Sequence, residues 1–332
     1  LIPVIWRVNT LPVGSNLSSI SNRFLYVSIM PFSLFASAMA QRLFKGYAKK
    51  YLVVGCLSVI IILTAPKREK NMIYGASFNT EYADYLGLDP RIAFTKILDD
   101  WQFKYLRLTA QWDLIEKTKG QYDWSNLDWM MAEAGKRNAK VVLVVGNKTP
   151  RWPECHFPSW VDASNHQPDL LNFIKTVVMR YKDHPALEVW QVENEPFLQF
   201  GDCGSISKQE LKDEVALVKQ LDPAHSTMVT DSGELSLWSH TAKQADLFGA
   251  TLYRVVWSKT FGYRSYDWWL PAFTYRAKLW FNGRDVNTAY ITELQAEPWI
   301  PNKPLADTPL EEQFKSMSLE RLKKNIIFAE KT

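Results

Sequence analysis

The chain has 332 residues, of which 47% are hydrophobic, so it is long enough to bury a sizeable core and does not have the composition of a disordered protein. Its formal net charge of +4 is unevenly distributed, because residues 1–70 carry a net charge of +8 and the remaining residues carry −4. The main part of the chain is therefore slightly acidic, which removes support for nucleic-acid binding, a function that needs a basic surface.

The N-terminal region, residues 1–70, is predicted to lie outside the main domain. Residues 51–65 are uncharged and strongly apolar, and lysine and arginine residues flank this run on both sides. The pattern is typical of the h-region of a signal peptide or of a short signal anchor, although the run is shorter than the roughly 20 residues that span a membrane comfortably. A buried core segment is the alternative. We expect an extracytoplasmic protein that is either secreted or attached to the membrane through residues 51–65.

From residue 71 onward, predicted strands and helices alternate at the spacing of βα units. The seven predicted strands are 72–78, 104–108, 140–145, the apolar run that begins at Val189, 226–230, 247–253 and 288–293. The predicted helical segments are 89–100, a helix capped by Ser125, residues 170–181, a helix after the capping box Ser207-Lys-Gln-Glu210, and a last region from Thr308 to the C-terminus.

Seven strands with seven helical connections predict an α/β fold over residues 71–332, a (β/α)8 TIM barrel that stops before its eighth βα unit. The last residue, Thr332, falls inside or just after the seventh predicted helix. Either the chain is a fragment of a longer protein or a partner supplies the missing strand, and we favour the fragment.

Two predicted strands end in a glutamate. The run from Val189 leads into Asn194-Glu195-Pro196, where proline ends the strand ladder, and Tyr290-Ile-Thr leads into Glu293. Their separation corresponds to three βα units, which places the two carboxylates on the fourth and seventh strands, facing each other across the C-terminal mouth of the barrel. A retaining glycosidase needs two carboxyl groups roughly 5 to 5.5 Å apart, one as nucleophile and one as acid.

With Arg107 at the end of the second strand and Tyr253 at the end of the sixth, these motifs resemble the clan of retaining glycoside hydrolases that includes cellulases, xylanases and mannanases. The chain is most similar to uncharacterised cellulase-like glycosidases that carry Pro-Arg-Trp-Pro-Glu-Cys-His and Glu-Leu-Gln-Ala-Glu-Pro-Trp. The resemblance implies that Glu195 is the general acid/base and Glu293 the nucleophile. It also implies that Asn194 binds the sugar 2-OH, while Arg107 and Tyr253 hold Glu293 ionised.

The chain departs from that pattern at the strand before Tyr253, where many clan members have histidine and this chain has Thr251, so the histidine hydrogen bond is either absent or rebuilt. Four other acidic residues compete for roles at this edge: Glu193, Asp231, Glu234 and Glu297. Neither Glu193 nor Glu297 ends a strand. Asp231 and Glu234 lie on the same rim, where they bind either substrate hydroxyls or loop amides.

Several aromatic residues in predicted loops are candidates for stacking on sugar faces: Trp112, Trp152, Trp257 and Trp299. Trp190 is a further candidate, with filling of the barrel as its alternative. His156 is predicted to contact substrate at the rim, with a structural role as the alternative. The histidines show no metal-binding spacing, and we expect neither a metal nor a cofactor.

Cys155 and Cys203 fall in loops after neighbouring predicted strands, so they form either a disulfide that braces the rim or two free thiols. The leading functional hypothesis is hydrolysis of β-linked glycosides or polysaccharides by double displacement, with a carbohydrate as the only partner that the sequence indicates. A carbohydrate-binding pseudoenzyme and a transglycosylase are the alternatives. The sequence specifies neither the sugar, nor the endo or exo mode, nor the oligomeric state.

Overall fold

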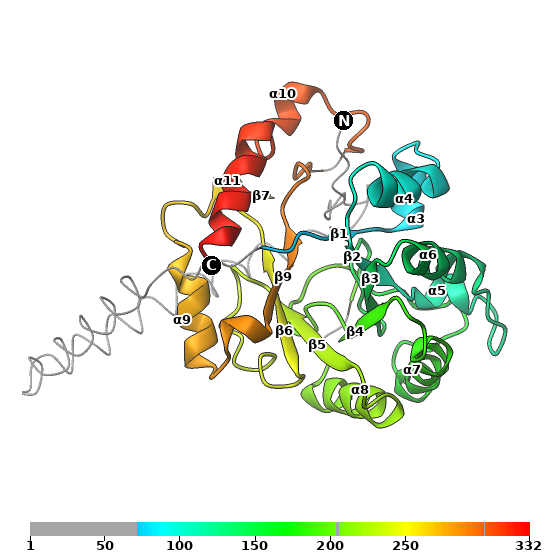
Figure 1. Cartoon of the computed structure of the whole chain (residues 1–332). Coiled ribbons are helices and arrows are strands. Elements are labelled where there is room, and N and C mark those ends of the chain that lie inside the picture. The colour runs from blue at the N-terminus through cyan, green and yellow to red at the C-terminus, as the bar shows by residue number, and fades with distance from the viewer. Residues whose placement is uncertain (1–71, 204–205, 302) are drawn as a thin grey trace, which may run out of the picture.

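The computed structural model describes residues 72–203, 206–301 and 303–332. Seven parallel strands form one sheet in the order β1-β2-β3-β4-β5-β6-β9, with most of the helices on its outside (Figure 1). The strands are β1 Ala76–Ser77, β2 Tyr105–Thr109, β3 Lys140–Val145, β4 Leu187–Val192, β5 Ser226–Asp231, β6 Leu247–Leu252 and β9 Ala289–Leu294. Spatial neighbours follow chain order, as in a TIM barrel.

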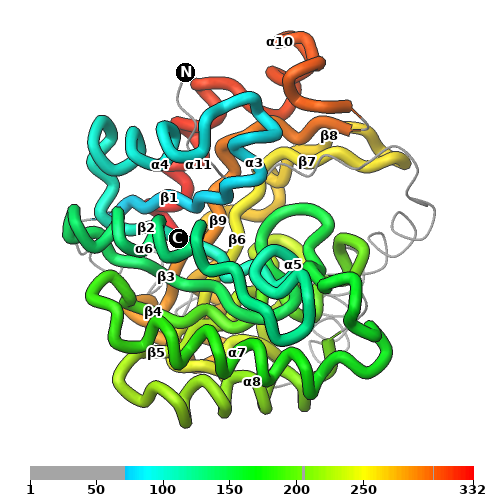
Figure 2. The backbone as a smooth tube through the Cα atoms, turned by 90° about the vertical axis from the view of Figure 1, so that its right-hand side faces the viewer, coloured from blue at the N-terminus to red at the C-terminus, as the bar shows by residue number. Residues whose placement is uncertain are grey.

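The helices follow the strands along the chain and are seen from the side in Figure 2. They are α3 Thr80–Tyr85, α4 Pro90–Asp99, α5 Trp112–Ile115, α6 Ser125–Lys136, α7 Gln167–Tyr181, α8 Lys208–Leu221, α9 Phe273–Phe281, α10 Leu310–Gln313 and α11 Leu319–Glu330, with a 3-10 turn η1 at Val286–Thr288. An antiparallel hairpin, β7 Val255–Ser258 with β8 Gly262–Ser265, projects after β6. The predicted capping box at the start of α8 is confirmed, because Ser207 and Glu210 exchange both hydrogen bonds.

The prediction of a TIM barrel without its eighth unit is confirmed. Within the part of the chain that the structure describes, no strand joins β1 to β9, so these two strands are the ends of the sheet. The sheet is nevertheless curled, since the side chain of Arg107 on β2 contacts both Gln191 on β4 and Glu293 on β9 across the interior. The carboxyl ends of all seven strands therefore surround one mouth.

Three details of the predicted elements are wrong. The first strand has two residues instead of seven, because Ile73 and Tyr74 are solvent-exposed and lie outside the ladder. The connection over 232–246, all of which is described, contains turns but no helix. Helix α6 begins at Ser125, but its cap is Trp124, and the Ser125 amide and hydroxyl both donate to the carboxylate of Asp123.

The core lies between the sheet and the helices. The β3 run is nearly all valine and leucine because it is covered on both faces, and Ile174 and Val178 of α7 belong to the same buried cluster as Leu143. Trp190 lies in this layer, where its indole N–H donates to Asp222 at the end of α8, 2.8 Å away. Both expectations for Trp190, a sugar contact and a barrel-filling residue, are therefore wrong.

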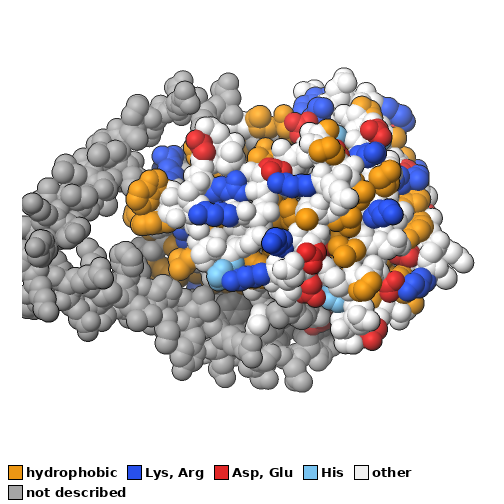
Figure 3. Space-filling view, turned by 90° about the horizontal axis from the view of Figure 1, so that it is seen from below, with side chains coloured by type: hydrophobic (Ala, Val, Ile, Leu, Met, Phe, Trp, Pro, Cys, Tyr) orange, Lys and Arg blue, Asp and Glu red, His pale blue; other side chains and the backbone are white. Residues whose placement is uncertain are grey.

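The apolar segment 51–65, predicted as a signal peptide or anchor, lies outside the described residues. Across the described ranges, no helix combines the length and the apolar character that crossing a membrane requires. On the face shown in Figure 3, basic, acidic and apolar side chains are interspersed, and no continuous basic surface is present there.

Candidate active site

The carboxylate of Glu293 is held from two sides at the mouth of the barrel. Arg107 donates from Nη1 to Oε1 over 3.0 Å, and the Tyr253 hydroxyl donates to Oε2 over 2.9 Å. The residue is 1% exposed. A buried carboxylate with one guanidinium and one phenol donor is stabilised in its ionised form. Both contacts predicted for Glu293 are present in the structure.

The guanidinium of Arg107 also connects Glu293 to the β4 edge. Its Nε donates to Gln191 Oε1 and its Nη2 donates to Asn194 Oδ1, each over 2.8 Å. The planar guanidinium thus orients three side-chain acceptors, two from β4 and the turn after it and one from β9, a geometry that lysine could not reproduce. The amide group of Asn194 is oriented by the arginine that also contacts Glu293.

Glu195 leaves β4 in a sharply turned conformation. Glu193 and Glu195 have φ values of 59° and 46°, in the left-handed region that non-glycine residues rarely occupy. The Glu195 amide donates to Thr230 Oγ1 on β5 over 3.0 Å, and the Thr251 hydroxyl on β6 donates to Glu195 Oε1 over 3.0 Å. Thr251, which stands where the resemblance led us to expect a histidine, therefore makes its own hydrogen bond to Glu195.

Thr251 also connects the two glutamates. It is the strand partner of Glu293 in the β6–β9 register, while its hydroxyl binds the carboxylate of Glu195. The predicted convergence of the fourth and seventh strands at one mouth agrees with this arrangement. Glu195 and Glu293 thus belong to a single buried polar cluster.

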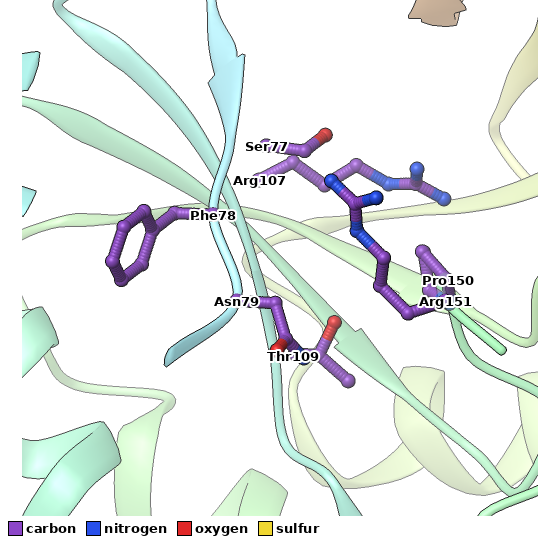
Figure 4. Close-up of a pocket in the computed structure, with 7 residues that line it drawn as sticks. All are labelled: Ser77, Phe78, Asn79, Arg107, Thr109, Pro150 and Arg151. Carbon is purple, nitrogen blue, oxygen red and sulfur yellow. The ribbon is translucent and has the colours of Figure 1, made fainter. Parts of the chain in front are cut away.

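A pocket opens beside this cluster at the carboxyl ends of β1 and β2 (Figure 4). Two arginines, three small polar residues and two apolar residues line it: Ser77, Phe78, Asn79, Arg107, Thr109, Pro150 and Arg151. Among the described residues, the buried Ser77 hydroxyl has no hydrogen-bond partner, so it is a candidate donor or acceptor for a bound molecule.

The rim of the pocket is held by Arg151. Its guanidinium lies 3.6 Å from the centre of the Tyr82 ring and forms an ion pair of 3.2 Å with Glu297. Tyr82 donates to the same carboxylate over 2.9 Å. Glu297 is thus engaged in linking the loop after β9 to α3, a structural role.

Two residues predicted to contact substrate are buried instead. Trp112 is fully buried, donates its indole N–H to Glu116 and stacks on Phe173 at 5.5 Å between ring centres. His156 is 4% exposed, and its Nε2 lies 3.3 Å from the carbonyl oxygen of Arg151. Trp112 belongs to the buried core cluster and is therefore corrected to a structural role, whereas contact of His156 with substrate stays a prediction.

Trp152 and Trp299 are partly exposed and belong to a row of rings. Trp152 lies edge-on to Phe200 at 6.2 Å, Phe200 lies 6.3 Å from Trp299, and Trp299 is perpendicular to Tyr253 at 5.9 Å. The row therefore reaches the tyrosine that binds Glu293. Trp257 lies on the β7–β8 hairpin opposite Tyr263, and its contact with substrate stays a prediction.

A disulfide joins Cys155 and Cys203, with 5.3 Å between their Cα atoms. It connects the loop after β3 to the loop after β4, which resolves the two alternatives for these cysteines in favour of the disulfide. The loops that carry Trp152 and Phe200 are thereby tied together.

The remaining acidic residues near the mouth bind loop groups. Asp231 accepts from the Ser236 and Thr241 hydroxyls, and Glu234 accepts from the Tyr253 amide and the Tyr275 hydroxyl. Burial raises the pKa of Glu234 to about 7, although the hydrogen bond from Tyr275 acts in the opposite direction. For Asp231 and Glu234 these contacts favour the loop-amide alternative over substrate binding.

Sequence reasoning missed the residues that orient the site from the second layer, above all Thr230, Gln191 and Lys148. Gln191 is a polar residue in the largely apolar strand β4 and contacts Arg107, and Thr230 precedes the last residue of β5 and contacts Asn194. A polar residue within a predicted strand was the available signal. Phe200 had no such signal, because its place in the aromatic row depends on how two loops meet.

Residues 106–216 match the family described as Glycosyl hydrolase family 10. The chain is 29% identical over 127 residues to the probable mannan endo-1,4-beta-mannosidase F of Emericella nidulans, an alignment that covers 34% of this chain and 28% of that protein. It is 23% identical over 188 residues to the putative mannan endo-1,4-beta-mannosidase 4 of Arabidopsis thaliana, covering 46% of each. The predicted resemblance to retaining glycoside hydrolases is confirmed over these segments.

A beta-galactosidase, LacZ of Lactobacillus acidophilus, is 25% identical over 158 residues, which cover 39% of this chain and 22% of that protein. The alignments thus span less than half the length of these relatives. Among solved structures, native xylanase 10B from Thermotoga maritima superposes with a TM-score of 0.46 at 17% identity, covering 73% of this chain and 74% of that one.

Proposed function

We propose that the protein is a retaining glycoside hydrolase that cleaves β-linked glycosides or polysaccharides. The observation that carries this proposal is the buried Glu293 carboxylate, held by Arg107 and Tyr253 at the carboxyl edge of a parallel barrel. Fixed donors on both oxygens keep the carboxylate ionised and aimed, which is what a nucleophile that attacks an anomeric carbon requires.

In the first step, Glu293 attacks the anomeric carbon and forms a glycosyl ester as the bond to the leaving oxygen breaks, and the Glu195 carboxyl group donates its proton to that oxygen. In the second step, Glu195 takes a proton from water, the water oxygen attacks the same carbon, and Glu293 is released. Asn194, oriented by Arg107, would bind the 2-OH, an interaction that strengthens in the transition state.

The binding surface supports a sugar polymer or oligosaccharide. Trp152, Phe200 and Trp299 line up toward Tyr253, and flat ring faces of this kind stack on sugars. The relatives are named as mannan endo-1,4-beta-mannosidases and beta-galactosidases. We therefore expect a β-mannoside as the first substrate class to test, followed by β-galactosides and β-xylosides.

The test is hydrolysis of aryl β-glycosides by the unmodified protein and by Glu293→Gln and Glu195→Gln. Removing the nucleophile is expected to lower kcat by at least about a thousandfold, since groups that act as one catalytic unit carry most of the rate. The matched control is Glu188→Gln on β4, an exposed carboxylate paired with Lys140 that is expected to leave the rate unchanged. Equal rates for Glu293→Gln and the unmodified protein would remove the proposal.

Retention is tested separately by following the anomeric configuration of the first product by NMR. A product of the same configuration as the substrate supports double displacement, and an inverted product contradicts it. Products longer than the substrate would identify a transglycosylase, and sugar binding without turnover would identify a pseudoenzyme.

An extracytoplasmic location is proposed on the disulfide, since such bonds form and persist in oxidising compartments. Alkylation of thiols in protein isolated from its native cells tests this. Cys155 and Cys203 should react only after reduction, whereas immediate reaction of both would contradict the location.

A further inference from the structure

Glu193, next to the proposed catalytic turn, binds the loop that follows β3. Its carboxylate accepts from the backbone amides of Asn147 and Lys148 over 2.7 and 2.6 Å, and the residue is fully buried. The loop can approach this closely because Gly146 has no side chain: a Cβ there would collide with Glu193 Oε1, and the φ of Gly146 is +125°. The carboxylate thus occupies a site shaped by the backbone.

The same loop holds the turn that carries Glu195. The buried ammonium of Lys148 donates to the carbonyl oxygens of Glu195 and Leu198 over 2.8 and 2.6 Å, and the Asn194 amide donates to the Lys148 carbonyl over 2.7 Å. Glu193 and Lys148 therefore form a reciprocal clamp between the loop after β3 and the left-handed turn after β4. Loss of either end would release the backbone on which Glu195 depends.

A second buried carboxyl group, Glu214 on α8, contacts this clamp from outside the barrel. It is 1% exposed and hydrogen-bonds to Glu193, and Gln167 of α7 donates to its Oε1 over 3.3 Å. Among the described residues, the buried Oε2 of Glu214 has no hydrogen-bond donor. Since two carboxylates cannot donate to each other, the contact requires a proton.

The proton belongs on Glu214, because both oxygens of Glu193 already accept amide N–H groups. Burial and the negative charge of Glu193 raise the pKa of Glu214 well above its ordinary range. The other charged groups that face the pair are Lys148, whose ammonium balances one negative charge, and Glu210 on α8, which adds to the repulsion.

We propose that Glu193 and Glu214 share one proton, and that this acid–carboxylate pair is a positioning device that holds the Glu195 turn in place. The inference rests on the proposed function for the role of Glu195. When the shared proton is lost, two buried carboxylates face each other with one ammonium to balance them, and the clamp loosens. The Glu195 turn is therefore held in place at neutral and acidic pH, where the proton is present, and loses its alignment at alkaline pH.

Hydrogen exchange of the unmodified protein is the first test, because it needs neither a variant nor a substrate. After correction for the intrinsic pH dependence of exchange, amide protection over 146–148 and 193–196 is expected to fall at least about tenfold as the pH rises into the alkaline range, where the pair loses the proton held by Glu214. Protection in the middle of α7 should stay constant. Constant protection in all three segments would overturn the proposal.

The second test compares Glu214→Gln with Asp213→Asn, an exposed neighbour on α8 that serves as the matched control. The glutamine amide still donates to Glu193 but never ionises. A carboxyl group whose pKa is higher in the folded protein than in the unfolded chain stabilises the fold less as the pH rises. The folding equilibrium constant of the unmodified protein therefore falls about tenfold per pH unit for each extra proton that the folded pair retains. We expect a flatter dependence of Tm on pH in Glu214→Gln and an unchanged one in Asp213→Asn.

Activity is read with an aryl glycoside whose leaving group needs no protonation, so that titration of Glu195 does not limit the rate. On this substrate, Glu214→Gln should keep its kcat at alkaline pH where the unmodified protein loses it, with KM little changed. Identical alkaline profiles would contradict the inference. If the protein is inactive but its amide protection and Tm depend on pH as expected, only the proposed function is contradicted. If it is active but neither quantity shows that dependence, only the shared-proton inference is contradicted.

Discussion

At the scale of single residues, the site depends on side chains that each satisfy several partners. Arg107 connects the β4 edge to β9 through three side-chain acceptors, and the Thr251 hydroxyl accepts from the Gly233 amide while it donates to Glu195. Buried polar groups of this kind are costly to disturb, because removing one partner leaves the other unsatisfied in a poorly solvated place.

Thr251 is therefore expected to matter for catalysis more than its small size indicates. Thr251→Val keeps the shape of the side chain but removes the donor to Glu195, so kcat should fall about tenfold to a hundredfold on substrates that need a proton. Thr251→Ser, which retains the hydroxyl, is the matched control. Steady-state kinetics with good and poor leaving groups checks this, and an equal loss on both substrates would contradict a role through the acid/base residue.

At the scale of elements, the mouth is built from loops after β3 and β4 that carry little regular structure of their own. The disulfide between Cys155 and Cys203, the Glu193–Lys148 clamp and the aromatic row all connect these two loops. Such loops lie on the surface and carry function, and their precision comes from cross-connections of this kind.

Removing the disulfide should therefore loosen the mouth as well as destabilise the fold. Cys155→Ser combined with Cys203→Ser is expected to lower the free energy of unfolding by about 2–4 kcal/mol, mainly because the unfolded chain gains freedom. Thermal unfolding with and without a reducing agent checks the value. The unmodified protein under reducing conditions should match the double variant, and an insensitive Tm would contradict the prediction.

At the scale of the whole molecule, buried carboxyl groups dominate the expected response to pH. Burial raises the pKa of Glu193 and of Glu234 to about 7 each, and raises that of Glu214 well above its ordinary range. In contrast, hydrogen bonds from Arg137 lower the pKa of Asp99, and hydrogen bonds from Lys136 and Arg137 lower that of Glu133.

The folded protein therefore binds more protons than the unfolded chain between the ordinary glutamate pKa of 4.5 and about 7. Stability should decrease as the pH rises through this window, and the low-pKa carboxylates should make it decrease again at strongly acidic pH. Calorimetric Tm values measured between pH 3 and 9 should show a maximum near the acidic end of the window. A maximum at or above about pH 8 would contradict this assignment of protons.

Much of the fold was predictable because local patterns report on burial. The valine-rich run of β3 and the capping box at Ser207 correspond to structure within one or two residues, since a strand covered on both faces and a capped helix start leave direct marks in the sequence. The two-residue β1 and the helix-free connection at 232–246 left no such marks, because their conformation depends on what packs against them.

By itself, the sequence placed two glutamates at one edge of a parallel barrel, because strand order and period decide which side chains reach that edge, and its resemblance to glycoside hydrolases implied that Arg107 and Tyr253 lie beside Glu293. Only the tertiary structure decided that Trp112 and His156 are buried, that Thr251 holds Glu195, and that Glu193 faces Glu214. These contacts join segments that the chain keeps far apart, and no local pattern encodes the distance between two side chains that belong to different loops and helices.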